Sequence, residues 1–232
     1  MEVYNLIPDT EQDKDYKPVE TLTDVFNKVV SHLLTQNKTS AEYGGSCKYR
    51  TFREDDTTLK CAVGCLISDS VYFEDLEDQM ANASDVIKAI QDSNPNFIVT
   101  DEIKEMMLQL QFLHDHCQEN IWFYMAFLIY RDFNLLLRQS FSNDLMPVIN
   151  NTFPDTHINQ RNMYVFLASN MEKSELIPSS EGMPKVATLK EEYLNILNSN
   201  KVDKETPFAF FKRKQSAFSN LIVDKVITTT HY

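Results

Sequence analysis

Glycine is scarce in this sequence, which has only 4 glycines among its 232 residues. The glycine-rich loops that hold nucleotide phosphates are absent, because neither a G-x-G-x-x-G fingerprint nor a G-x-x-x-x-G-K-[ST] loop occurs. The H-E-x-x-H zinc motif and the G-x-S-x-G nucleophile turn are absent as well. Nucleotide-dependent enzymes of the common kinds are therefore not expected, and the motif evidence as a whole is against an enzyme.

The sequence also lacks a hydrophobic run long enough to span a membrane. Its longest apolar run covers residues 121–130. A spanning helix needs about 20 apolar residues, so this run predicts a buried core element instead. The acidic N-terminus has no apolar segment of the kind found in secretory signals. We therefore expect the protein to act in a reducing cytoplasm, where its four cysteines are thiols or metal ligands rather than disulfides.

Positive charge is in short supply, with 22 Lys and Arg residues against 34 Asp and Glu residues and a net charge of −12. This balance opposes binding to nucleic acid, which requires clustered basic residues. An acidic surface favours solubility, and the alternatives are binding of a basic partner and mimicry of nucleic acid. No acidic row has the regular spacing that such a mimic needs.

One basic cluster lies near the C-terminus, where Lys212, Arg213 and Lys214 follow Phe211. On a helix, this combination of aromatic and basic side chains is a candidate surface for docking a partner. The simpler interpretation is that the basic side chains pair with carboxylates of the protein itself, because the composition is so acidic.

Apolar residues recur every three or four positions along much of the chain, which predicts helices. The first is expected to begin at a Thr21 or Thr23 cap and to end near Gln36. Pro207 lies in the first turn of the last predicted helix, where proline is favoured. The remaining helical predictions cover residues 72–76, 85–91, 100–117, 119–131, 133–141, 162–172, 187–197 and 206–227.

A β-hairpin is predicted between the first two helical regions. Residues 47–52 have strand character, residues 53–58 form a polar turn, and residues 59–67 are the partner strand or the entry to a helix. The predicted fold class is therefore α+β, mainly helical, with one small β-hairpin packed on helices. We expect a polar arm at 1–20, a helical core with the hairpin at 21–150 and a C-terminal helical extension at 151–232, with a linker near 177–184.

The segment from Gly44 to Cys65 holds three of the four glycines and three of the four cysteines. One interpretation is a zinc site, whose ligands would be Cys47, Cys61, Cys65 and His114, although the paired C-x-x-C motifs of many zinc sites are missing. A second is a thiol enzyme in which His114 is the base for a nucleophilic Cys47. The third, which we favour, makes the cysteines small buried residues and requires no cofactor.

Other titratable groups near this segment have simple interpretations. His114 lies on the apolar stripe of its predicted helix, which is typical of a core histidine bonded to a backbone carbonyl, whereas His116 points away and is expected to be exposed. Asp69, Glu74 and Glu77 are candidate acid and base groups. Further carboxylates lie among them, which favours a solvated acidic face instead.

Several short motifs run through the first half of the chain. They are Cys47-Lys-Tyr-Arg, then Lys60-Cys-Ala-Val-Gly-Cys-Leu-Ile, then Asp69, Tyr72 and Glu77, and finally a Leu-Gln-x-x-His-Asp element at 110–115 and Trp122. In this pattern the chain resembles a family of small uncharacterised proteins encoded by tailed bacteriophages, including cyanophages. The resemblance covers about residues 22–130; the polar turn at 53–58 is longer than in the family, and the region after about residue 150 is an addition. It implies a phage-encoded protein and no particular activity.

These observations give one leading hypothesis and two alternatives. The leading hypothesis is a phage-encoded, non-enzymatic factor that binds a host or phage protein in the host cytoplasm. The first alternative is a zinc- or thiol-dependent enzyme centred on the four predicted zinc ligands. The second is a structural or packaged component of the virion.

Overall fold

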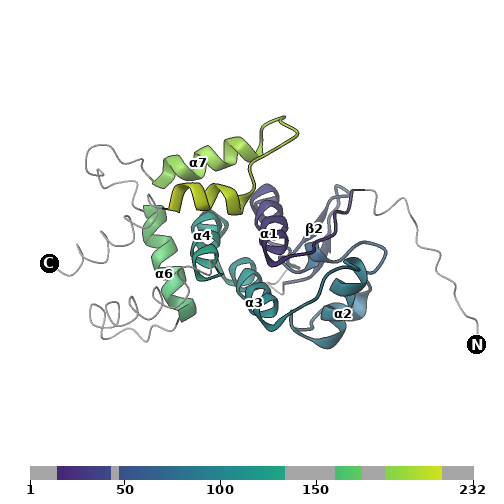
Figure 1. The fold of residues 1–232 in the computed structure, drawn as a ribbon. Helices are drawn as coiled ribbons and strands as arrows, with labels where there is room; N and C mark the ends of the chain where they lie inside the picture. The colour runs from purple at the N-terminus through teal and green to yellow at the C-terminus, as the bar shows by residue number, and fades with distance from the viewer. Residues whose placement is uncertain (1–14, 43–46, 134–159, 174–185, 216–232) are drawn as a thin grey trace, which may run out of the picture.

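The computed structural model describes residues 15–42, 47–133, 160–173 and 186–215. Within these ranges the protein is mainly helical and carries one two-stranded antiparallel hairpin, so the predicted α+β class is confirmed (Figure 1). No helix in the described part of the chain has both the length and the apolar character needed to cross a membrane. The predictions for residues 134–159, for the linker near 177–184 and for residues 216–227 lie outside the described residues.

Helix α1 (Leu22–Gln36) begins at the predicted cap. The Thr21 hydroxyl accepts a hydrogen bond from the Asp24 N–H at 3.1 Å, and the Asp24 carboxylate accepts one from the Thr21 N–H at 3.0 Å. This reciprocal pair satisfies N–H groups that a helix start leaves without partners. The helix ends at Asn37, which adopts the left-handed conformation with φ 45°. Its buried face is Val25, Phe26, Val29, Val30, Leu33 and Leu34.

The hairpin is shorter than predicted. Strand β1 (Arg50–Phe52) pairs with β2 (Thr58–Lys60) in antiparallel register, with Arg50 opposite Lys60. After Lys60 the chain leaves the sheet and forms a single turn of 3₁₀ helix, η1 (Gly64–Leu66). Both alternatives predicted for residues 59–67 therefore occur in succession: the strand ends at Lys60, and the buried apolar residues that follow lead into η1.

The middle of the chain is a series of short helices. These are η2 (Glu74–Leu76), α2 (Ser84–Ser93), α3 (Asp101–His116), η3 (Glu119–Ile121) and α4 (Trp122–Phe133). Every residue of α4 is buried, because α1, α3 and α6 (Gln160–Lys173) pack around it (Figure 1). The predicted core element at 121–130 is confirmed.

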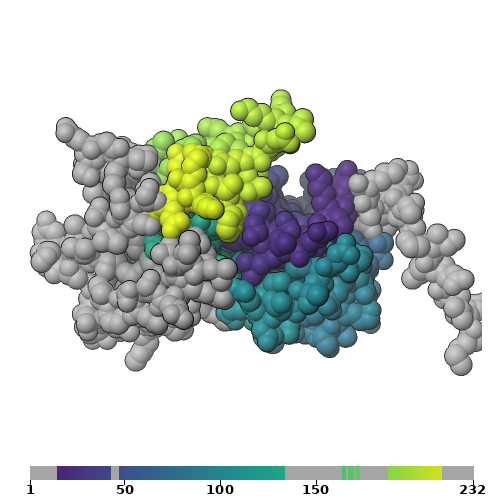
Figure 2. Space-filling model, viewed as in Figure 1, coloured from purple at the N-terminus to yellow at the C-terminus, as the bar shows by residue number. Residues whose placement is uncertain are grey.

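The C-terminal helices share this core. They are α6, α7 (Val186–Leu197) and a helix over residues 207–215, whose segment lies against α1 (Figure 2). Phe210 and Phe211 are fully buried. Their rings contact an aromatic cluster from α1, α4 and α7 that consists of Phe26, Phe123, Phe127, Tyr130 and Tyr193.

The described end of the predicted N-terminal arm packs on the core as well. Val19 is buried, and its N–H donates to the Asn94 side-chain oxygen at 2.8 Å. The Tyr16 hydroxyl donates to the Leu66 carbonyl at 2.6 Å. These contacts tie residues 15–20 to α2 and η1, which the polar composition of the arm did not predict.

Candidate functional site

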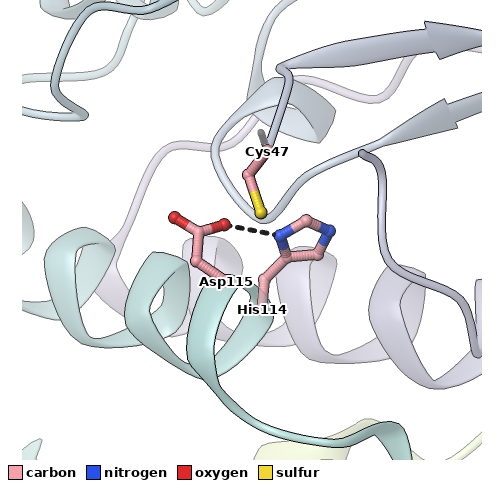
Figure 3. Close-up of side chains that lie close together, drawn as sticks. All are labelled: Cys47, His114 and Asp115. Carbon is pink, nitrogen blue, oxygen red and sulfur yellow. Dashed lines mark hydrogen bonds and ion pairs between the residues drawn. The ribbon is translucent and has the colours of Figure 1, made fainter. Parts of the chain in front are cut away.

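The candidate site lies where the hairpin meets the end of α3. Cys47 precedes β1, and His114 and Asp115 are in the last turn of α3 (Figure 3). The thiol, imidazole and carboxylate ligand atoms lie within 4.8 Å of one another. The structure therefore brings together the predicted pair of Cys47 and His114, and adds Asp115, which the sequence did not single out as a site residue. Cys61 and Cys65 are not members of this group.

The hydrogen bonds of His114 fix its protonation. The backbone N–H of Ser40 points at Nε2 with a distance of 2.9 Å, and Nδ1 lies 2.7 Å from the Asp115 carboxylate. Because a backbone N–H can only donate, Nε2 accepts and the ring proton is on Nδ1, from which it is donated to Asp115. The imidazole is therefore a neutral group with both nitrogens occupied, and neither has a lone pair directed at Cys47.

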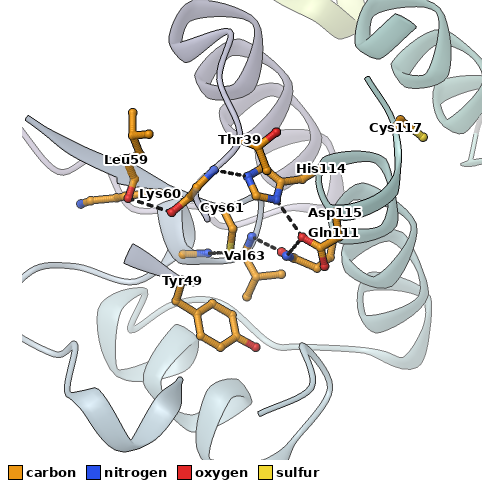
Figure 4. Close-up of polar contacts among 12 residues, drawn as sticks. Thr39, Tyr49, Leu59, Lys60, Cys61, Val63, Gln111, His114, Asp115 and Cys117 are labelled. Carbon is orange, nitrogen blue, oxygen red and sulfur yellow. Dashed lines mark hydrogen bonds and ion pairs between the residues drawn. The ribbon is translucent and has the colours of Figure 1, made fainter. Parts of the chain in front are cut away.

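Asp115 is the centre of the polar network rather than its end. Besides His114, its carboxylate accepts a hydrogen bond from the Gln111 amide at 2.6 Å (Figure 4). Partial burial alone would raise the pKa of Asp115, but the hydrogen bonds from His114 and Gln111 outweigh burial and lower it. Gln111 and Asp115 are four residues apart on one helix face, a spacing from which their contact was predictable.

Gln111 links this network to the segment after the hairpin. Its side-chain oxygen accepts the backbone N–H of Val63 at 3.1 Å (Figure 4). On the other side, Ser40 connects the loop after α1 with the hairpin, because its hydroxyl donates to the Leu59 carbonyl at 3.2 Å. The network thus fastens three separate chain segments to the end of α3.

Cys47 is poorly suited to nucleophilic attack. It is half-buried, and burial, the negative charge of Asp115 and a hydrogen bond to that carboxylate raise the pKa of Cys47 to about 12. A nucleophilic cysteine needs the opposite environment, with a positive field or a base that removes the proton. Cys47 and His114 therefore lie close together, as predicted, but both nitrogens of His114 are already hydrogen-bonded, so the imidazole is not placed to remove the thiol proton.

The other cysteines are buried, as the favoured interpretation predicted. The Cys61 sulfur accepts the Gly64 N–H at 3.2 Å, and the Cys65 thiol donates to the Ala62 carbonyl at 3.2 Å. Burial raises the pKa of Cys61 well above its ordinary value and raises the pKa of both Cys65 and Cys117 to about 12. These groups are neutral thiols at physiological pH.

The predicted four-ligand zinc site is not assembled. Cys61 and Cys65 bond within their own turn and do not join Cys47 and His114. In the cluster of Cys47, His114 and Asp115, the Nδ1 that would face a metal carries a proton, and zinc binds thiolate and unprotonated imidazole. The donor set present does not fit zinc without a change of tautomer and loss of the Ser40 contact.

The remaining motif residues also serve the fold. The Arg50 guanidinium pairs with Asp69 at 2.5 Å, lies over the Tyr72 ring at 4.1 Å and donates to the Ile67 and Ser68 carbonyls at 2.9 and 3.1 Å. This arrangement uses the planar fork of arginine to join β1 to the chain after η1. Asp69 is exposed at the surface and is an ion-pair partner of both Arg50 and Lys60.

Glu77 has a similar role at the start of β1. Its carboxylate accepts the Tyr49 N–H at 2.8 Å, the Arg50 N–H at 3.0 Å and the Tyr72 hydroxyl at 2.6 Å. Two backbone donors beside the hairpin are thereby satisfied by a side chain from the η2 region. The candidate acid and base carboxylates Asp69 and Glu77 both hold the hairpin.

The predicted docking surface near the C-terminus needs one correction. Phe211 is fully buried in the aromatic cluster and offers nothing to a partner. Arg213 pairs with Glu205 at 2.6 Å and with Glu192 at 3.3 Å, and Lys214 pairs with Glu192 at 2.8 Å. Arg213 and Lys214 therefore pair with carboxylates of the protein itself, as the simpler interpretation predicted. Lys212 is exposed.

At pH 8, Cys47 in the native protein is expected to react with iodoacetamide about 1,000-fold more slowly than free cysteine. The reason is its raised pKa of about 12, compared with 9.0 for an ordinary cysteine, which removes most of the reactive thiolate. Mass spectrometry of timed samples measures the rate, with Cys47→Ser to assign the signal and urea-unfolded protein as the fully reactive reference.

Two results would contradict this description of the site. One is native-state alkylation of Cys47 as fast as in the unfolded chain. The other is close to one zinc ion per chain by elemental analysis, lost together with the folded state on addition of a chelator. Either would favour the alternative of a zinc- or thiol-dependent enzyme.

No protein-family model, curated protein or solved structure matches the chain.

Proposed function

We propose that this chain is a phage-encoded, non-enzymatic protein that binds a host or phage protein with a basic surface in the host cytoplasm. The observation that carries the non-enzymatic part is the arrangement around Asp115. The thiol of Cys47 stays protonated, the neutral His114 has both nitrogens occupied, and the carboxylate holds the proton donors in place. No nucleophile–base pair is left there to act on a substrate.

The motif residues have a structural role. Arg50, Asp69, Tyr72 and Glu77 contact one another or the hairpin backbone, and Gln111 contacts both Val63 and Asp115. A pattern made of such residues specifies a local fold, so proteins that share the pattern are expected to share this hairpin and its support. Function is then expected to reside on the surface that the fold presents.

Surface charge supports a basic partner. Exposed carboxylates lie at the tip of the hairpin, at Glu54, Asp55 and Asp56, and in η2, at Glu74 and Asp75; these five residues are the acidic surface of the proposal. With a net charge of −12 for the whole chain, a positively charged surface is attracted over a distance of several ångströms before contact. Complementary charge of this kind sets association rate and partner choice more than final affinity.

A pull-down from infected host cells is expected to recover one stoichiometric partner at 50 mM salt and to lose most of it at 500 mM salt. Charge reversal by Glu54→Lys with Glu74→Lys is expected to lower recovery several-fold, because both side chains belong to the acidic surface. The matched control is Glu191→Lys with Asp203→Lys, which changes the net charge equally at exposed sites elsewhere.

The proposal fails if the wild-type protein recovers no stoichiometric partner at low salt. It also fails if both double variants recover the partner equally well, since the acidic surface then has no part in binding. Detection of the chain as a fixed number of copies in purified virions would favour the alternative of a virion component.

A further inference from the structure

A pocket of about 410 Å³ opens beside the candidate site, between the start of the hairpin and one face of α3. Cys47 and Asp115 line it on the side of the polar network, and Leu108 and Phe112 line it from α3. Met80 also lines the pocket and is 70% exposed. The pocket therefore combines the Asp115 carboxylate with an apolar wall, and this wall is not part of the polar network.

The charge of this pocket is negative and unbalanced. The donors to the Asp115 carboxylate are the Cys47 thiol, the Gln111 amide and the His114 imidazole, and no lysine or arginine is among them. Lys48 is the one lysine or arginine among the lining residues, and its ammonium group is 3.0 Å from Asp78 and 4.0 Å from Glu42. The exposed His116 also lines the pocket, with its ring 4.9 Å from that of Phe112.

The apolar wall limits which cation fits. A hydrated metal ion gains nothing from Leu108, Phe112 and Met80, whereas a cation on an aliphatic stem buries the stem against them. A guanidinium group adds a flat face that stacks on an aromatic ring and a fork that matches a carboxylate. Arginine is thus the side chain whose chemistry matches the carboxylate, the ring and the exposed methionine together.

We infer that this pocket receives an arginine side chain of the partner protein, with its guanidinium group directed at Asp115. The inference rests on the proposed function and deepens it, because it names the group that the partner inserts. The acidic surface at the hairpin tip attracts the basic partner, and the pocket supplies the fixed contact. Such a buried anchor surrounded by weaker contacts is typical of protein interfaces.

The first test uses a small probe and needs no partner. N-acetyl-arginine methylamide is titrated into the ¹⁵N-labelled protein, and saturable shifts are expected for backbone amides of Gln111 and Phe112. The matched probe is the citrulline derivative, which has nearly the same shape without the charge. The lysine derivative is expected to bind several-fold more weakly than arginine. Equal shifts with citrulline, or no saturable shift with arginine, would overturn the inference.

The second test places a cation in the pocket by mutation. Met80→Lys is expected to weaken arginine binding by roughly tenfold or more, because the new ammonium group competes for the carboxylate. Ile98→Lys is the matched control, since Ile98 is 76% exposed, apolar and not among the lining residues. Equal binding by the two variants would contradict the placement of the arginine in this pocket.

The same two variants separate this inference from the proposed function. If Met80→Lys and Ile98→Lys both recover the partner from lysate as well as the wild type does, the partner docks elsewhere and the inference fails while the proposed function stands. If the wild type recovers no partner, the proposed function fails, and with it the assignment of the arginine to a partner.

Discussion

Replacing Gly64 with alanine is expected to lower the free energy of unfolding by about 3 kcal/mol or more. A Cβ atom at this position would lie 2.2 Å from the carbonyl oxygen of Tyr49 and 3.0 Å from its carbonyl carbon. Contacts of that length do not occur, so one of the two backbone segments must move. Neither is free to move, because the same Tyr49 oxygen accepts the Cys61 N–H at 3.2 Å.

Equilibrium unfolding in urea measures this effect, with far-UV circular dichroism as the signal. Ser84→Thr is the control, because it also adds one methyl group but at an exposed position at the start of α2. The control is expected to change stability by about 0.5 kcal/mol or less. A loss below about 1 kcal/mol for Gly64→Ala would show that the close approach of Gly64 to the Tyr49 backbone is not required by the fold.

The close contact at Gly64 helps to explain why glycine and cysteine gather in the segment from Gly44 to Cys65. The sequence singled it out by its glycines and cysteines, which left chemistry and architecture as competing explanations. Gly64 has a steric reason: the backbone of Tyr49, the residue before β1, lies so close that no room is left for a side chain. The neighbouring Cys61 and Cys65 bond within that turn, so packing explains residues 61–65 of the segment.

Local patterns were sufficient for most of the helices. The Thr21 cap, the Asp24 carboxylate three residues later and the apolar stripe that follows are signals contained within one helix, and the structure has the helix at those residues. The same holds for α3, where the Thr100 hydroxyl accepts the Ile103 N–H at 3.3 Å. Helices are predictable to this degree because their hydrogen bonds and caps join neighbours in sequence.

The site depends on contacts that no local pattern contains. His114 was expected to bond a backbone carbonyl, but its partners are the Ser40 N–H, 74 residues away, and the adjacent Asp115. Glu77 reaches back 28 residues to the Tyr49 N–H. Which carboxylate satisfies which donor is decided by tertiary packing, so a supporting Glu77 cannot be told from a solvated one by local pattern alone.

Phe211 is a second case in which tertiary packing overrides a local pattern, because a residue predicted at the surface is buried. Beside three basic residues, a phenylalanine on a helix was a reasonable candidate for a docking surface. A helix has two faces, however, and the aromatic cluster that buries Phe211 comes from α1, α4 and α7. Nearby on the same helix, Arg213 pairs with Glu192 and Glu205, and Lys214 pairs with Glu192.

Replacing His114 with alanine is expected to destabilise the protein by about 3 to 4 kcal/mol. The imidazole is buried, its ring packs 5.7 Å from that of Trp122, and both of its nitrogens are bonded. Alanine leaves a cavity beside Trp122 and strands the buried Ser40 N–H without an acceptor. It also removes one donor from the Asp115 carboxylate.

Two conservative variants divide this loss between the two hydrogen bonds. The amide oxygen of glutamine reaches about as far as Nε2, so His114→Gln is expected to keep the Ser40 contact and lose the donation to Asp115. Asparagine reaches about as far as Nδ1, so His114→Asn is expected to keep Asp115 and lose Ser40. Because an unsatisfied buried backbone donor costs about 1 to 3 kcal/mol, while Asp115 retains Gln111 as a donor, the asparagine variant is expected to be the less stable of the two.

Urea unfolding of the three variants and the wild type measures the order, with His116→Ala as the control at an exposed histidine two residues away. The expected order of stability is wild type, glutamine, asparagine, alanine, with the control within about 0.5 kcal/mol of wild type. If alanine is tolerated as well as the control, the network around Asp115 does not hold the fold. The cluster of Cys47, His114 and Asp115 would then need another reason to exist, and chemistry at Cys47 is the first to examine.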